Sequence, residues 1–207
     1  MRCYGHEMRK KIVDEHEDVI PVLKLKLLPG QEIQGDAGKK ITDEYYVFDV
    51  KQNGKIIDSI VCSPTTARDF LNLTGHKPLS TFNPFRANRN QVLGNGCGNV
   101  TNKIHTTLSP TEKQLAIAIH WIFMLFGGRP TDGELLSIYT QMLNRNIKTM
   151  TSINGVNTII YRSFNGKSLT SVIKSKKFNN LSKQAVNFSL IKTMYNKMKY
   201  HTEPYSF

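Results

Sequence analysis

The chain has 207 residues, which allow one generous domain or two small ones, with an apolar core that needs no disulfide or metal. Its 28 Lys and Arg residues exceed its 16 Asp and Glu residues by 12, and this charge favours polyanionic partners such as DNA, RNA or an anionic membrane. Three widely spaced cysteines argue against a disulfide framework, and the most apolar run, residues 115–126, is too short to span a bilayer. We therefore expect a cytoplasmic protein without a membrane partner.

Positive charge is concentrated late in the chain. Residues 1–50 contain 8 basic and 10 acidic side chains, whereas residues 151–207 contain 9 basic side chains and 1 acidic side chain. The late lysines alternate with Phe, Tyr, Ile and Met, a pattern typical of a folded surface rather than of a low-complexity tail. The C-terminal part is therefore predicted to carry a folded basic face.

The first part of the chain is predicted to contain strands and one short helix. The apolar run at 19–28 indicates a strand. Residues 45–62 predict a β-hairpin, because two β-rich runs meet across Asn53-Gly54, a strong hairpin-turn signal. Ser63-Pro64 then supplies a helix start and Gly75 a helix end. Residues 1–80 are therefore predicted to form an α+β domain.

The second part of the chain is predicted to be mainly helical. An Asn-, Gly- and Pro-rich segment, residues 81–108, is the predicted linker or long loop. Capping boxes begin two helices that end near residues 126 and 143. Helices are also predicted at 168–177 and 182–200, and Asn154-Gly155 predicts a second hairpin. The fold class is thus α+β, with a mainly helical, basic domain at 109–207.

The helix pair and the hairpin after it match the outline of a helix-turn-helix with a β-wing. Helix pairs joined by short turns are, however, common in any helical domain. The second helix also begins with Asp132 and Glu134 rather than with basic residues. The helix-turn-helix is one hypothesis for this region, and an ordinary pair of core helices is the other.

Candidate DNA contacts come from the linker and from the lysine-rich end of the chain. Lys side chains attract phosphates, and Asn side chains can read adenine edges. On the predicted last helix an apolar stripe points inward, which leaves Lys192, Asn196 and Lys199 on another face. The alternative is a solvated lysine face without a partner. The candidate DNA-binding residues are Arg86, Arg89, Lys167, Lys174, Lys176, Lys177, Lys183, Lys192, Asn196 and Lys199.

An enzyme alternative rests on the hairpin. Asp49 and Lys51 share one face of their strand, and a two-residue turn would place Asp58 opposite Asp49. Two carboxylates could bind Mg²⁺ while the lysine orients water, as in a DNA endonuclease. The same residues also fit an ordinary solvated hairpin face. No catalytic residue, metal site or cofactor is assigned, because zinc-ligand spacing, a dinucleotide-binding glycine pattern and a locatable catalytic triad are lacking.

Part of the chain resembles a module of phage homing endonucleases. The similar stretch is Tyr46-Val47-Phe48-Asp49-Val50-Lys51 and residues 60–75, followed by Phe82-Asn83-Pro84-Phe85. In that family the module accompanies a separate nuclease domain and assists DNA binding, and similar stand-alone versions act as transcriptional repressors carried by phage satellites. Gly-Ile-Tyr and His-Asn-His nuclease patterns are missing here. The resemblance, over roughly a third of the chain, implies site-specific DNA binding without cleavage. It also implies a bacterial host cell, where the protein would be cytoplasmic or associated with the nucleoid.

These patterns predict a sequence-specific double-stranded DNA-binding protein, a transcriptional repressor that occludes a promoter. Lysines would neutralise phosphates, while Asn and Arg would give base or shape selectivity. A homodimer is expected, because the apolar helix at 115–126 exceeds what one small domain buries. The alternatives are a Mg²⁺-dependent DNA endonuclease and an RNA-binding protein, which would prefer structured RNA to duplex DNA.

Overall fold

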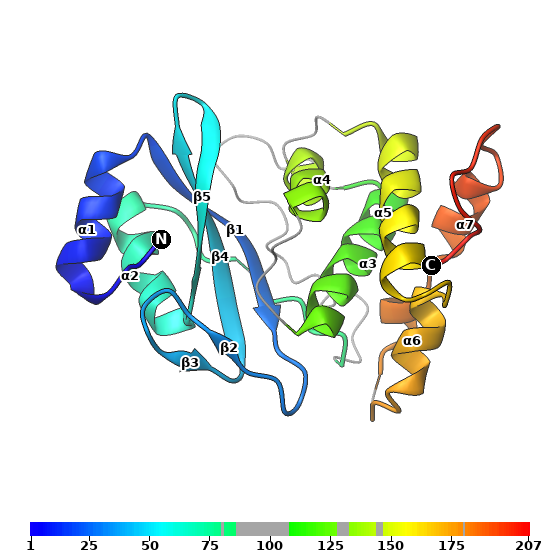
Figure 1. Ribbon diagram of the computed structural model, residues 1–207, viewed down its shortest axis with the longest axis horizontal. Coiled ribbons are helices and arrows are strands. Elements are labelled where there is room, and N and C mark those ends of the chain that lie inside the picture. Colours follow the sequence, from blue (N-terminus) through cyan, green and yellow to red (C-terminus); the bar gives the residue numbers. More distant parts are fainter. Residues whose placement is uncertain (80, 86–107, 128–132, 144–146, 180) are drawn as a thin grey trace. The chain divides into compact units, whose positions relative to one another are not determined.

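The computed structural model describes residues 1–79, 81–85, 108–127, 133–143, 147–179 and 181–207, and its elements are labelled in Figure 1. Contacts within the chain divide it into two compact units. The N-terminal unit is built mainly from Met1–Phe82, and the C-terminal unit mainly from Thr106–Leu125 and Pro130–Phe207. The expected α+β class is confirmed, since an antiparallel sheet is combined with helices.

The N-terminal unit is a three-stranded antiparallel sheet with two helices, α1 and α2, on one face (Figure 1). The strand order is β1-β4-β5, and β2 pairs with β3 in a separate small sheet. The core between the sheet and these helices includes Phe48, Ile60 and Phe70, all fully buried. The elements are α1 (Gly5–Glu15), β1 (Asp18–Lys26), β2 (Ile33–Gln34), β3 (Lys40–Ile41), β4 (Glu44–Gln52), β5 (Lys55–Cys62) and α2 (Pro64–Thr74).

Local signals in the sequence place several of these elements correctly. The hairpin predicted at 45–62 is β4–β5, and its turn residues Asn53 and Gly54 have positive φ angles of 51° and 70°, as a two-residue Asn-Gly turn requires. The strand predicted at 19–28 is β1. Helix α2 has Ser63 as its N-cap and ends at Gly75, whose φ is 71°. These predictions are confirmed.

The register of the hairpin differs from the expected one. A bulge between Val50 and Lys51 pairs Val50 with Asp58 and Asp49 with Ser59. Successive residues of a strand point to opposite faces, so Asp49 and Asp58 lie on opposite faces of the sheet. The predicted pair of carboxylates across the turn is therefore wrong.

The C-terminal unit is helical, and α4 and α7 each pack against α5. The predicted capping box of α3 is confirmed, because Ser109 N donates to Glu112 Oε2 at 2.7 Å and Glu112 N donates to Ser109 Oγ at 3.3 Å. The buried Trp121 indole donates to the Ala185 carbonyl oxygen at 2.6 Å. The elements are α3 (Pro110–Phe126), α4 (Gly133–Leu143), α5 (Thr149–Ser163), α6 (Leu169–Ser175), the 3₁₀ helix η1 (Lys183–Val186) and α7 (Ser189–Tyr195).

Two predictions for this unit are wrong. Asn154-Gly155 lies inside α5, so no hairpin, and hence no β-wing, follows the α3–α4 pair at that position. The helix predicted at 182–200 is divided into η1 and α7, because the Asn187 side chain accepts a hydrogen bond from Ser189 N at 3.1 Å and begins a new helix there. The helix predicted at 168–177 is confirmed as α6, with Ser168 as its N-cap.

Helix α3 has no need of a second chain to be buried. All residues from Leu115 to Met124 are buried in the single chain, which removes the reason given for a homodimer. Within the described part of the chain, no single helix is both long enough and apolar enough to cross a membrane.

Candidate nucleic-acid interface

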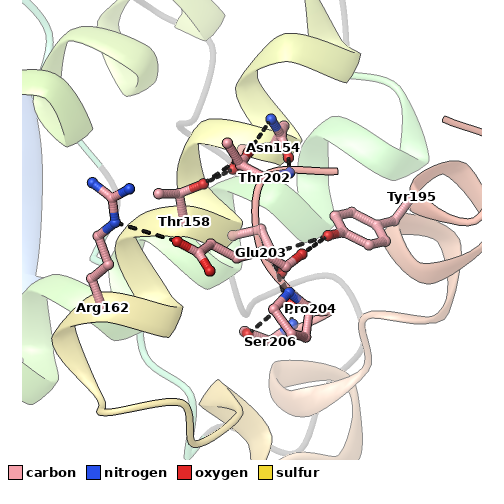
Figure 2. A network of polar contacts seen from close by, with 9 residues as sticks. Asn154, Thr158, Arg162, Tyr195, Thr202, Glu203, Pro204 and Ser206 are labelled. Carbon is pink, nitrogen blue, oxygen red and sulfur yellow. Dashed lines mark hydrogen bonds and ion pairs between the residues drawn. The ribbon is translucent and has the colours of Figure 1, made fainter. Parts of the chain in front are cut away.

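The last residues of the chain, 202–207, form a strap that is fixed to α5 and α7 (Figure 2). Asn154 Nδ2 donates to Thr202 Oγ1 at 2.6 Å, and the Tyr195 hydroxyl donates to the carbonyl oxygen of Glu203. Leu169 N, at the start of α6, donates to the Ser206 carbonyl oxygen at 2.7 Å. The strap therefore ties α5, α6 and α7 together.

Asn157 is the buried clamp at the centre of this arrangement. It is 0% exposed, donates to the Pro204 carbonyl oxygen at 2.8 Å and accepts a hydrogen bond from Ser206 N at 2.7 Å. Buried amides are costly unless both ends are paired, and here both ends are. Asn157 thus fixes the strap, and with it the surface that α6 and α7 expose.

Eight lysines on this surface, here called the C-terminal lysine set, all point to solvent. Three belong to α6 and the turn after it, one to η1, one to α7, and the others to the connections around these helices. Asn196, the C-cap of α7, is also exposed. The set consists of Lys167, Lys174, Lys176, Lys177, Lys183, Lys192, Lys197 and Lys199.

The positive charge of the C-terminal lysine set has little local compensation. Glu203 is the one acidic residue in 151–207, and its carboxylate pairs with Arg162 at 3.5 Å. Within the described ranges, no lysine of the set forms an ion pair; Lys192 Nζ instead lies 5.8 Å from the centre of the Tyr205 ring. The set therefore presents an outward positive field, as the charge distribution in the sequence predicts.

The other candidate positions are less informative. Arg86 and Arg89 fall outside the described residues. Helix α4, which would be the recognition helix of a helix-turn-helix, exposes Glu134, Ser137 and Gln141, and thus no basic side chain among its described positions. His120, read from the sequence as a core histidine, is indeed buried, and burial lowers its pKa to about 3.

The residues of the nuclease alternative do not converge. Asp58 lies 3.0 Å from the amino group of Met1, on the helix-covered face of the sheet. Asp49 is fully buried on the other face, and neither of its carboxylate oxygens hydrogen-bonds to a described residue. Burial raises the pKa of Asp49 to about 6, and the neighbouring Lys51 opposes part of this increase. Groups of three or more metal-ligating side chains are missing from the described residues.

The N-terminal unit contains a polar cluster that the sequence patterns do not predict. Asp69 of α2 hydrogen-bonds to His6 Nδ1 at 2.9 Å and to Arg9 Nε at 2.5 Å, both from α1. Partial burial would raise the pKa of Asp69, but the hydrogen bonds from Arg9 and His6 lower it. His6 and Arg9 lie 63 and 60 positions from Asp69 in the sequence, so only the packing of α1 on α2 brings them together. We interpret the cluster as a structural link between these helices.

Comparison with known proteins places the chain in a family. Residues 2–206 match the family model described as Uncharacterised conserved protein UCP028583. The chain belongs to this family. No curated protein and no solved structure is significantly similar to it. The family description assigns no activity, so function has to be argued from the residues of the chain.

Proposed function

We propose that this protein binds double-stranded DNA through the C-terminal lysine set and represses transcription by occupying a promoter. The observation that carries the proposal is the exposure of eight lysines in a region whose one carboxylate, Glu203, is paired with Arg162. Surface ammonium groups replace the counterions condensed on the DNA backbone, and the release of those ions supplies binding free energy.

The candidate residues divide into two roles. The lysines neutralise phosphates, which sets affinity and position, while Asn196 and the linker residues Arg86 and Arg89 supply base or shape selectivity. The elements α6, η1 and α7 are preferred over a helix-turn-helix made by α3 and α4, because the described exposed residues of α4 include an acid and no base. Sequence specificity and repression follow the resemblance to the homing-endonuclease module and its stand-alone relatives.

The test is a mobility-shift selection on a fragmented genomic library, performed with the full chain across a salt series. We expect intact fragments to be retained, and enrichment of one site would support a repressor. The logarithm of the affinity should fall with the logarithm of salt concentration by roughly 0.9 for each phosphate contacted. Absence of any retained DNA at low salt would refute the proposal.

The same selection, repeated with Mg²⁺ and with structured RNA, distinguishes the other functions. Cut ends that require Mg²⁺ and disappear in Asp49→Ala would indicate an endonuclease. Stronger retention of structured RNA than of duplex DNA would indicate an RNA-binding protein. The nuclease is not favoured, because Asp49 and Asp58 lie on opposite faces of the sheet.

A further inference from the structure

Tyr200 is the most exposed large hydrophobic side chain among the described residues, at 87%. In the sequence it follows Lys197 and Lys199 and precedes His201, and these three side chains are also exposed. A single exposed aromatic residue is ordinary on a protein surface. Here, however, the ring belongs to the most basic part of the chain, whose positive potential attracts polyanions.

The backbone on both sides of Tyr200 is anchored. Before it, Lys197 N donates to the Met194 carbonyl oxygen at 3.0 Å and Met198 N donates to the Tyr195 carbonyl oxygen at 3.1 Å. After it, the His201 ring stacks on the Tyr195 ring with centroids 4.2 Å apart, and Thr202 is held by Asn154. A ring displayed from a fixed backbone loses little conformational freedom when a ligand covers it.

A tyrosine ring beside lysines has the chemistry of a stacking platform. Proteins that bind single-stranded nucleic acid combine cations along the backbone with aromatic rings that stack on bases. Inside a duplex both faces of a base are covered by its neighbours, so a tyrosine can stack only on an unpaired or terminal base.

We propose that Tyr200 stacks on an unpaired nucleobase while Lys197 and Lys199 hold the adjoining phosphates. This inference rests on the proposed DNA binding and adds to it a preference for duplexes interrupted by unpaired bases, such as a gap or a single-stranded tail. Tyr200 is then the residue that selects this DNA structure, and the other lysines of the set hold the flanking duplex.

The experiment compares three DNAs of the same sequence: a blunt duplex, the duplex with a single-stranded tail, and the single strand. Dissociation constants are measured by fluorescence anisotropy for the wild type, Tyr200→Ala, Tyr200→Phe and the control Tyr4→Ala, which removes a 74% exposed tyrosine of the N-terminal unit. Tyr200→Ala should weaken binding to the tailed duplex and the single strand roughly tenfold and change blunt-duplex binding much less, because a blunt end offers only the outer face of its last base pair. Tyr200→Phe and Tyr4→Ala should match the wild type.

A second readout is the fluorescence of 2-aminopurine placed in the tail, which stacking quenches. The wild type should quench it and Tyr200→Ala should not. Equal affinities of wild type and Tyr200→Ala for all three DNAs, together with normal duplex binding, would overturn the stacking inference and leave the proposed function standing. Failure of the wild type to bind any of the DNAs at low salt would overturn both.

Discussion

The two units of the chain treat their charged residues differently. In the N-terminal unit acids and bases pair with one another, as in Arg9–Asp69, Lys24–Glu44 and Lys40–Glu32. In the C-terminal unit the one ion pair among the described residues is Arg162–Glu203, and the lysines face solvent. Arg9–Asp69 and Lys24–Glu44 are half-buried and Lys40–Glu32 is exposed, but in each of the three an acid beside the base cancels its local field. The candidate interface is therefore chosen on the distribution of acidic partners around the lysines and not on net charge alone.

The largest expected effect is the loss of DNA affinity when lysines of the C-terminal unit are replaced. Replacing Lys174, Lys183, Lys192 and Lys199 with Gln should weaken duplex binding at low salt by about a hundredfold or more and reduce the salt slope by roughly 3 to 4, because each phosphate contact contributes about 0.9. The measurement is a salt series of anisotropy titrations.

The matched control removes the same charge from the N-terminal unit. Lys10, Lys39, Lys55 and Lys77 are also exposed, and their replacement with Gln lowers the net charge equally. We expect at most a few-fold loss of affinity. Equal losses in the two quadruple variants would show that total charge, not the C-terminal surface, governs binding.

The next effect is on the stability of the C-terminal unit. Asn157→Ala leaves the Pro204 carbonyl and the Ser206 amide without their buried partner, which should lower the free energy of unfolding by about 2 to 4 kcal/mol. Denaturant unfolding followed by Trp121 fluorescence measures this, because Trp121 is the one tryptophan and lies in this unit. Asn154→Ala, which removes a more exposed contact to Thr202, should cost less than about 1 kcal/mol.

The third effect concerns the N-terminal unit and depends on pH. The pKa of Asp49 is about 6 in the fold, against 3.8 for a free side chain, so the folded chain holds this proton more tightly and loses stability as pH rises from about 4 to 6. Asp49→Asn should therefore increase the free energy of unfolding at pH 8 by on the order of 1 to 3 kcal/mol.

This gain should shrink between pH 6 and pH 4 and vanish below pH 4, where both states of the wild type are protonated. Denaturant melts at pH 8, 5 and 3.5 follow the change. The control, Asp43→Asn, removes a 70% exposed carboxylate and should have an effect below about 1 kcal/mol at every pH. A gain from Asp49→Asn that is the same at all three values would contradict the raised pKa.

The smallest effect contrasts two glycines. Gly54 has a φ of 70°, so Gly54→Ala should cost about 1 kcal/mol in the N-terminal unit. Gly133, the first residue of α4, has open space where a Cβ would stand, and Gly133→Ala should cause no loss. Thermal melts of the two variants give the comparison, and a destabilising Gly133→Ala would contradict it.

The same dipeptide shows what the sequence can and cannot predict. Asn53-Gly54 is a hairpin turn because both residues adopt the positive φ angles that such a turn needs, and a hydrogen bond from Gly54 N to the Glu17 carboxylate at 2.7 Å is compatible with it. Asn154-Gly155 lies in a helix because each residue serves a distant partner: Asn154 holds Thr202, and a Cβ on Gly155 would stand 3.3 Å from Ile138 Cδ1 of α4. A turn signal depends only on residues adjacent in the sequence and contains no information on contacts with other helices. The predicted wing is wrong for this reason.

The candidate site follows the same rule. The exposure of the lysines could be predicted, because charge is a local property. Phe188, Ile191 and Tyr195 of the predicted apolar stripe are buried, but Met198 is half-buried, because α7 ends at Tyr195. The strap and its clamp could not, since Asn157 and Ser206 are 49 positions apart. The bulge that separates Asp49 from Asp58 also leaves no mark in the residue types.

Both edge strands of the N-terminal sheet carry local obstacles to the addition of a further strand. On β1, Pro21 has no amide hydrogen to donate, a bulge follows it, and Leu25 bridges to Phe82. On β5, Asp36 bonds Val61 twice, through its backbone amide at 2.8 Å and its carboxylate at 2.7 Å. Unpaired strand edges are the usual templates for aggregation. The two edge strands of this sheet thus carry features that oppose pairing with a second copy of the chain.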